Sequence, residues 1–241
     1  MNNITYAITT YPGDRDYNED FAIAKQTDNG FCFIVADGLG GHGKGEVASE
    51  LVCLVGTDFF ANAEHPEDIY GMFDISQEKL LEKQQEEHAV DAMKTTMNIV
   101  TIAKGVIRWG HVGDTRTYYF KKNKLVFRTK DHSVPQMMVS MGEIKEKDIR
   151  NHPDRNRLLK VMGIEWSKPQ YVIEEQIKVE GKQAFLLCSD GFWEFIEEKD
   201  MMKCLKKAKT AEQWLESMND IVMKNGNGHN MDNFTALAVW I

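Results

Sequence analysis

The chain has 241 residues, of which 42% are hydrophobic and 27% charged, and this composition is typical of a globular protein that buries a full core. A formal net charge of −8 argues against a nucleic-acid-binding surface, which needs a basic patch. The sequence shows no signal-peptide pattern and no apolar run long enough to span a bilayer, so we expect a soluble, cytoplasmic protein. The four cysteines form no CxxC pair and are interpreted as reduced thiols.

The first part of the chain predicts short strands and two long helices. Asp28-Asn29-Gly30 is a favourable hairpin turn between two of the strands. One helix carries a broad apolar face, whereas the other is rich in Gln and Glu. We interpret its polar faces as solvated, and a partner surface is the alternative. The predicted strands span residues 4–10, 21–25, 31–36 and 95–102, and the predicted helices span residues 44–63 and 75–93.

In the rest of the chain, strands again follow one another through tight turns, around a long polar segment at residues 133–162. This succession indicates antiparallel sheets rather than a doubly wound parallel sheet. Because the sequence has no repeat and no low-complexity linker, we expect one domain over residues 1–241. The predicted strands span residues 106–112, 118–120, 125–127, 170–179, 183–188 and 234–241, and the predicted helices span residues 192–195, 200–208 and 211–224.

Asp37 ends a buried strand and is followed by a glycine-rich loop. Taken alone, this pattern fits a metal-binding turn and an ordinary strand-to-helix turn equally well. Three other acidic clusters end apolar runs in the same manner, and a fourth precedes one. Carboxylate-rich sites favour Mg²⁺ or Mn²⁺ over zinc. These clusters are Asn18-Glu19-Asp20, Gly113-Asp114-Thr115-Arg116, Cys188-Ser189-Asp190-Gly191 and Met231-Asp232-Asn233.

Five motifs stand in a fixed order along nearly the whole chain: RDYNED at 15–20, ADGLGGH at 36–42, GHVGDTR at 110–116, LCSDG at 187–191, and DN at 232–233. With these motifs the chain resembles the metal-dependent PP2C family of serine/threonine protein phosphatases, particularly its bacterial members. The resemblance implies an α+β fold, a four-layer αββα sandwich of two antiparallel sheets flanked by helices. It also implies a metal site between the sheets at one edge and a flap subdomain at about residues 133–168.

The resemblance implies a site for two Mn²⁺ or Mg²⁺ ions, which ready a water for in-line attack on phosphorus. Asp37 would bridge both ions and the Gly38 carbonyl would complete the coordination of one, while Asp190 and Asp232 would ligate the other. For Asp232, an ordinary turn residue is the alternative.

Two further carboxylate positions complete the implied metal set. Asp20, with Glu19 beside it, would ligate directly or through metal-bound water, and a turn aspartate is again the alternative. Asp114 would form a third, weaker metal site together with Asp190.

Arg15 matches the family arginine that grips the substrate phosphate, because its fork can bind two oxygens. The alternative is a surface arginine paired with Asp14 or Asp16. For Arg116 we expect a structural role, in which a salt bridge braces the Asp114 turn.

Several other positions have more than one interpretation. His42 is a candidate general acid, although a structural hydrogen bond is favoured and metal-bound water could serve instead. His111 and His132 are interpreted as structural. The arginines of the flap could contact an acidic phosphopeptide or be solvated charges. These flap arginines are Arg150, Arg155 and Arg157. A separate stretch, Met93-Lys94-Thr95-Thr96, departs from the family pattern, because the family usually has Gly before the paired threonines.

These residues predict a metal-dependent phosphatase that acts on phosphoserine and phosphothreonine of proteins and opposes a Ser/Thr kinase. We expect a monomer that binds neither nucleic acid nor a membrane. The alternative is a catalytically weak phosphatase-like domain that binds or regulates a partner. Such a domain would be expected to lose its metal carboxylates, and all of them are present here.

Overall fold

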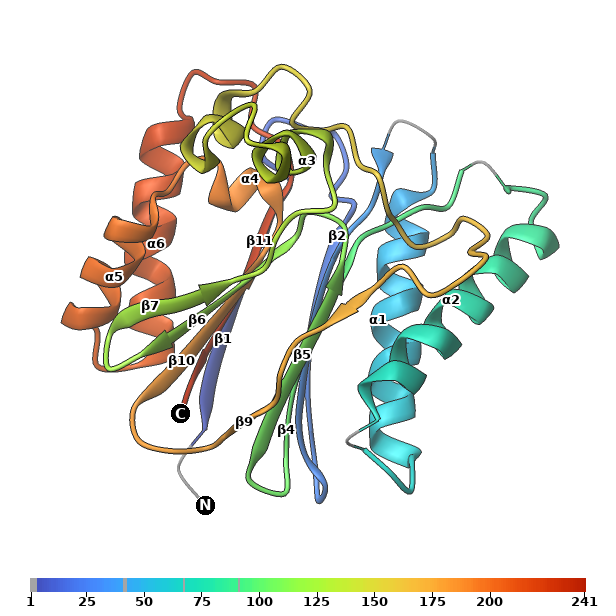
Figure 1. Cartoon of the computed structure of the whole chain (residues 1–241), viewed down its shortest axis with the longest axis horizontal. Coiled ribbons are helices and arrows are strands. Elements are labelled where there is room, and N and C mark those ends of the chain that lie inside the picture. The colour runs from blue at the N-terminus through green and yellow to red at the C-terminus, as the bar shows by residue number, and fades with distance from the viewer. Residues whose placement is uncertain (1–3, 41–42, 67, 91) are drawn as a thin grey trace.

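The computed structural model describes residues 4–40, 43–66, 68–90 and 92–241. Two antiparallel β-sheets stack face to face, and a pair of helices covers the outer face of each sheet (Figure 1). The predicted α+β fold, a four-layer αββα sandwich, is therefore confirmed. None of the described helices is long and apolar enough to cross a membrane.

The first sheet has the strand order β1-β11-β10-β6-β7, so strands from the two ends of the chain lie side by side. Helices α5 and α6 cover its outer face (Figure 1). The strands are β1 (Thr5–Tyr11), β6 (Arg116–Lys121), β7 (Lys124–Arg128), β10 (Gln183–Cys188) and β11 (Phe234–Trp240), and the helices are α5 (Glu198–Lys207) and α6 (Ala211–Gly226).

The second sheet has the order β2-β3-β4-β5-β8, and β9 also pairs with β5. The predicted hairpin turn joins β2 to β3 and needs glycine, because Gly30 has φ 131° and a Cβ there would lie 2.0 Å from the Ile102 carbonyl oxygen. The elements are β2 (Asp20–Thr27), β3 (Gly30–Asp37), β4 (Met97–Ala103), β5 (Val106–Val112), β8 (Val172–Ile173) and β9 (Ile177–Lys178), with α1 (Gly45–Asn62) and α2 (Ile69–Glu86) outside them.

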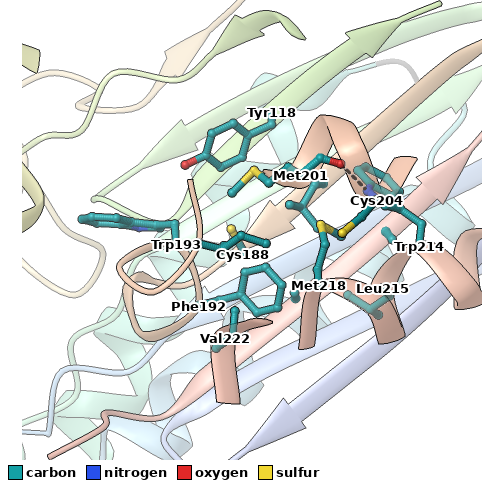
Figure 2. Close-up of a cluster of buried hydrophobic side chains, with 14 of the residues drawn as sticks. Tyr118, Cys188, Phe192, Trp193, Met201, Cys204, Trp214, Leu215, Met218 and Val222 are labelled. Atoms are coloured by element: carbon teal, nitrogen blue, oxygen red, sulfur yellow. Dashed lines mark hydrogen bonds between the residues drawn. The ribbon is translucent and has the colours of Figure 1, made fainter. Parts of the chain in front are cut away.

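The central strands are buried on both faces, which explains why the sequence shows continuous apolar runs there. Phe33, Phe185 and Leu237 fill the space between the sheets. A second apolar layer lies between the first sheet and its helices, where Trp214 and neighbouring side chains pack together (Figure 2). All four cysteines are buried and free, as expected.

The predicted helix at residues 75–93 was wrong in its boundaries, because α2 begins at Ile69 and ends at Glu86. The side chain of Asp68 caps its N-terminus by accepting from the Gly71 N–H, and the added first turn buries further apolar side chains. Val90, which falls within the predicted helix, lies beyond its observed end and is 59% exposed. The strand predicted at 170–179 is interrupted, because β8 and β9 are two short strands.

The segment at 133–168, predicted to form a flap, contains helix α3 (Val134–Met141) and a 3₁₀-helix at Glu146–Asn151. It lies at the upper end of the sandwich in Figure 1, close to the short helix α4 (Asp190–Trp193). Ser133 caps α3 with its side chain, and Gly142 ends the helix in the left-handed conformation.

Candidate active site

Carboxylates from five places in the sequence meet at one edge of the sandwich. Asp20 begins β2 and stands opposite Asp37, which ends β3. Asp190 begins α4 directly after β10, and Asp232 comes just before β11. Asp114 lies in the turn that leaves β5. Because these strand ends lie at the same edge of the two stacked sheets, residues more than two hundred positions apart become neighbours.

A cleft of about 860 Å³ opens at this edge. Most of the residues predicted for the site line it, whereas Asp20 is buried beside Asp37 instead. His42 lies outside the described residues. None of the described residues in the cleft wall is a histidine or a cysteine. The predicted residues that line the cleft are Arg15, Glu19, Asp37, Gly38, Asp114, Asp190 and Asp232.

Four of the clustered carboxyl groups have raised pKa values, because burial disfavours their charged forms; they are Asp20, Asp37, Asp114 and Asp190. Burial raises the pKa of Asp20 to about 7, and that of Asp114 to about 7 with a further contribution from Asp131. The pKa values of Asp37 and Asp190 lie well above the usual value, first through burial and then through repulsion from the neighbouring carboxylates. The cluster therefore holds unfavourable negative charge that a cation would neutralise.

Two details of the site agree with a bound divalent ion. The Asp20 Oδ2 atom accepts from Ser189 Oγ at 2.6 Å, while its buried Oδ1 atom has no hydrogen-bond partner. A buried carboxylate oxygen without a partner needs an explanation, such as an ion. The donor set consists of carboxylates and backbone carbonyls, which hard cations prefer. The residues present therefore fit Mg²⁺ or Mn²⁺.

The carboxylates do not yet form a closed cage. Within the described ranges, no group of three or more His, Cys, Asp or Glu side chains is arranged to hold an ion as it stands. Asp232 is instead engaged by Arg15, whose Nε and Nη2 atoms lie 3.0 and 3.1 Å from its two oxygens. Arg15 therefore pairs with Asp232 and not with Asp14 or Asp16, which were the alternative partners. Arg15 lines the cleft, and its side chain is 45% exposed.

Glycine is required at position 38 by close contacts. The Gly38 N–H donates to the Glu19 carbonyl oxygen at 3.1 Å, and a Cβ at this position would lie 2.4 Å from the Gly45 carbonyl oxygen. The strand end at Asp37, the Glu19 loop and the start of α1 can therefore approach one another only because no side chain intervenes.

Arg116 makes a salt bridge beside the Asp114 turn, as expected, and its partner is Asp131. It is buried, and its Nε and Nη2 atoms donate to the two oxygens of Asp131 at 2.8 and 2.6 Å. Its guanidinium also lies 3.4 Å from the ring centre of Trp193, and the Trp193 indole donates to the Asp114 carbonyl oxygen at 3.1 Å. The brace thus runs through Asp131 and Trp193, two residues that carry no recognisable signal in the sequence.

Two more positioning side chains belong to quoted motifs but had no assigned role. Ser189 holds Asp20, as described above. The Asn233 Oδ1 atom accepts from the Glu19 N–H, and its Nδ2 atom donates to the carbonyl oxygens of Pro12 and Tyr17, all at 2.8 Å. One amide therefore ties the loop carrying Arg15 to the start of β11. Each residue directly adjoins a predicted ligand, and this adjacency was the available signal.

The paired threonines that follow the departure at Lys94 contact the backbone of Asp37. The Thr95 hydroxyl donates to the Asp37 carbonyl oxygen at 2.8 Å, and the Thr96 hydroxyl accepts from the Asp37 N–H at 2.9 Å. Lys94, which stands where the family usually has Gly, lines the cleft. The paired threonines therefore fix the backbone of Asp37 from the neighbouring strand.

His111 and His132 stack on each other with ring centres 4.7 Å apart and do not line the cleft. Each flap arginine pairs with a carboxylate of this chain, Arg150 with Glu198, Arg155 with Glu194 and Arg157 with Asp154. These contacts favour the interpretation of the flap arginines as structural or solvated charges over contact with a phosphopeptide.

Comparison with known proteins agrees with the geometry. The sequence model of the protein phosphatase 2C family matches residues 14–233. The serine/threonine phosphatase stp of Listeria welshimeri is 30% identical over 93% of this chain and 90% of that protein. The structure of Stp1 from Staphylococcus aureus superposes with a TM-score of 0.87 at 25% identity, covering 99% of this chain and 95% of that one.

A third relative was solved with metal. The catalytic domain of PstP, in complex with two manganese ions, has a TM-score of 0.80 at 23% identity and covers 98% of this chain and 97% of that one. The family match spans most of the chain, and the fold and the curated relatives agree with it. The chain therefore belongs to the protein phosphatase 2C family in its bacterial type and is a protein serine/threonine phosphatase.

Proposed function

We propose that this phosphatase hydrolyses phosphoserine and phosphothreonine esters at the carboxylate cleft, with two Mn²⁺ or Mg²⁺ ions bound there. The observation that carries the proposal is the convergence of Asp37, Asp190 and Asp232 on one cleft, beside an unpartnered carboxylate oxygen of Asp20. Bound divalent cations supply charge neutralisation at phosphorus and lower the pKa of a water.

The chain's own residues take distinct parts in this proposal. Asp37, the Gly38 carbonyl, Asp190 and Asp232 hold the two ions, and Asp20 supports them from its buried position. Asp114 and Asp190 hold a third ion more weakly. A carboxylate that is uncharged in the metal-free protein releases its proton when it ligates, so ion binding is coupled to pH.

Arg15 binds the phosphoryl group of the substrate. Its bidentate contact with Asp232 already demonstrates the geometry in which a guanidinium holds two oxygens of one anion. If Asp232 were to ligate an ion, the fork of Arg15 would be released for the phosphate in the same cleft. Ground-state binding of the phosphate is therefore its main contribution.

The substrates we propose are phosphorylated proteins, and the counterpart enzyme is a Ser/Thr kinase of the same cell. We also propose that the chain acts in the cytoplasm as a monomer. The stp and PstP relatives are Ser/Thr phosphatases by name, which supports the substrate class.

The direct test is hydrolysis of a phosphothreonine peptide and of p-nitrophenyl phosphate, with Mn²⁺, with Mg²⁺ and with EDTA. We expect activity with the ions and none with EDTA, and loss of at least about 10³-fold in kcat for Asp37→Asn and Asp190→Asn. Asp58→Asn on the exposed face of α1 is the matched control and should behave as the parent. Undiminished activity after full chelation would refute the metal assignment.

A further inference from the structure

Two glutamines on helix α2 hold both backbone polar groups of one residue, Gly163. The Gly163 N–H donates to Gln77 Oε1 at 2.9 Å, and its carbonyl oxygen accepts from Gln84 Nε2 at 2.7 Å. The same side chains also donate to the carbonyl oxygens of Ile164 and Met93, at 2.5 and 2.6 Å. Gln84 is 1% exposed and Gln77 7% exposed, so these hydrogen bonds are shielded from water.

The spacing of the two glutamines along α2 allows both side chains to reach Gly163 from the same face of the helix. They are seven residues apart, which places them two turns apart on the same face of α2. Apart from Ser76, which donates to the Val52 carbonyl oxygen, the rest of that face is apolar, with Phe73 and Leu80 among its buried side chains. Burial of a primary amide is costly unless its hydrogen bonds are satisfied. An apolar side chain would fill these positions as well, so packing alone does not account for them.

The backbone at Gly163 is shaped to fit this pair. Gly163 has φ 84°, and a Cβ there would lie 2.3 Å from the Met93 carbonyl oxygen and 2.9 Å from Gln84 Nε2. The chain can therefore approach the helix this closely only with glycine in this position. We refer to Gln77, Gln84 and Gly163 together as the glutamine clamp.

The clamp sits behind one wall of the catalytic cleft. Val161 and Ile164, on either side of the clamped position, line the cleft. Between them, Met162 is bonded to Thr95, its N–H lying 2.8 Å from the Thr95 carbonyl oxygen. Thr95 also holds the Asp37 carbonyl oxygen through its hydroxyl, but Thr96 holds both the N–H and the carbonyl oxygen of Asp37. Loosening the clamp therefore acts directly on the wall and reaches Asp37 only at one remove, through Thr95, while the contacts of Thr96 persist.

We propose that Gln77 and Gln84 are positioning residues, which fix the cleft wall at 161–164 from the outer helix layer and thereby set how well a phosphopeptide binds. Neither glutamine lines the cleft, so both act through the wall. The inference rests on the proposed function, because the wall matters only if a peptide lies along it. A small aryl phosphate, which has no peptide chain, does not need the wall.

The test compares Gln84→Met and Gln77→Met with the matched control Gln85→Met, an identical change at an exposed position one residue further along α2. For the clamp variants we expect KM for a phosphothreonine peptide to rise about five- to tenfold. The kcat/KM for p-nitrophenyl phosphate should change by less than about twofold. Amide hydrogen exchange at 161–164 should become about tenfold faster, with β10 unchanged.

Parental exchange rates at 161–164 in both folded variants would overturn the proposal, and so would equal losses toward peptide and aryl phosphate. Gln77 lies nearer the surface than Gln84, so its variant provides the test if Gln84→Met does not fold. Hydrogen exchange needs no turnover. An inactive parent would therefore refute the proposed function while the exchange data still decide on the clamp.

Discussion

Asp20 and Asp37 are paired across the β2–β3 ladder, with Asp20 buried and Asp37 at the wall of the cleft. One oxygen of Asp20 has no partner. Folding brings these acidic groups together although their repulsion opposes it, as expected when a cation completes a site. This relationship leads to the first prediction.

The metal-free protein should become less stable as pH rises from 6.5 to 8. The folded-state pKa values of Asp20 and Asp114 are raised to about 7, above the ordinary value near 3.8. Their contribution to stability is therefore fully present below about pH 4 and is lost as pH rises through about 7. Thermal unfolding in EDTA measures this effect, and we expect the free energy of unfolding to fall by about 1–2 kcal/mol between pH 6.5 and 8.

Adding Mn²⁺ should reverse that trend, because the ion binds only the charged carboxylates. The unfolding temperature in Mn²⁺ should therefore rise from pH 6.5 to 8. An unfolding temperature in EDTA that is flat or rising over the same window would contradict the assigned pKa shifts.

Replacing Arg15 should weaken substrate binding more than it slows turnover. Arg15→Ala removes the two-pronged contact with phosphate, and Arg15→Lys keeps the charge but not the fork. We expect KM for a phosphopeptide to rise about tenfold or more in Arg15→Ala, with a smaller change in kcat. Steady-state kinetics with saturating Mn²⁺ measure both constants. An unchanged KM would show that Arg15 serves only to pair with Asp232.

Breaking the buried Arg116–Asp131 pair should destabilise the protein strongly. Arg116→Leu leaves the Asp131 carboxylate buried without its partner, which costs about 3–5 kcal/mol in comparable sites. The double variant Arg116→Leu/Asp131→Leu removes both charges and should recover part of that loss. Urea unfolding of the parent, the single variant and the double variant measures the free energy of unfolding of each. Equal stability of the single variant and the parent would mean that the pair does not brace the fold.

His132 should make the protein sensitive to acid. Burial lowers the folded-state pKa of His132 to about 3. Between about pH 6.5 and 3, His132 is therefore protonated in the unfolded chain and neutral in the folded protein. Its contribution to stability is present above about 6.5 and is lost as pH falls toward 3.

The parent should therefore lose about 1–3 kcal/mol more than His132→Asn between pH 6.5 and 4.5. Comparing the two proteins cancels the titration of groups remote from His132, while His111, which stacks on it, is a neighbour whose titration also changes. If the free energies of unfolding of the parent and the variant depend on pH in the same way, His132 is not the source of the acid sensitivity.

The sequence predicted the sheets well because their signals are local. Apolar runs such as Gln183–Cys188 and the turn at Gly30 depend on neighbouring residues alone. The start of α2 was missed because its cap, Asp68, stands before a stretch without a clear helical stripe. Boundaries of this kind depend on which apolar side chains find a surface to bury against, which is decided by the tertiary fold.

The predicted site residues came from motifs, and the fold places them at one cleft edge. The supporting side chains were not predictable in the same way. Arg116 finds Asp131 fifteen positions away, and Gln84 finds Gly163 across 79 positions. In the sequence, Gln84 is one of several polar residues in a charged helix, and only its position on the buried face separates it from Gln85. Such long-range contacts exist only after the sheets have stacked.

The most direct measurement of the central claim is anomalous diffraction from a crystal grown with Mn²⁺, recorded at the manganese edge. We predict two strong peaks in the cleft, both within coordinating distance of Asp37, with Asp190 and Asp232 on one of them, and a weaker third peak beside Asp114. A cleft without manganese peaks, at an ion concentration that saturates activity, would contradict the account.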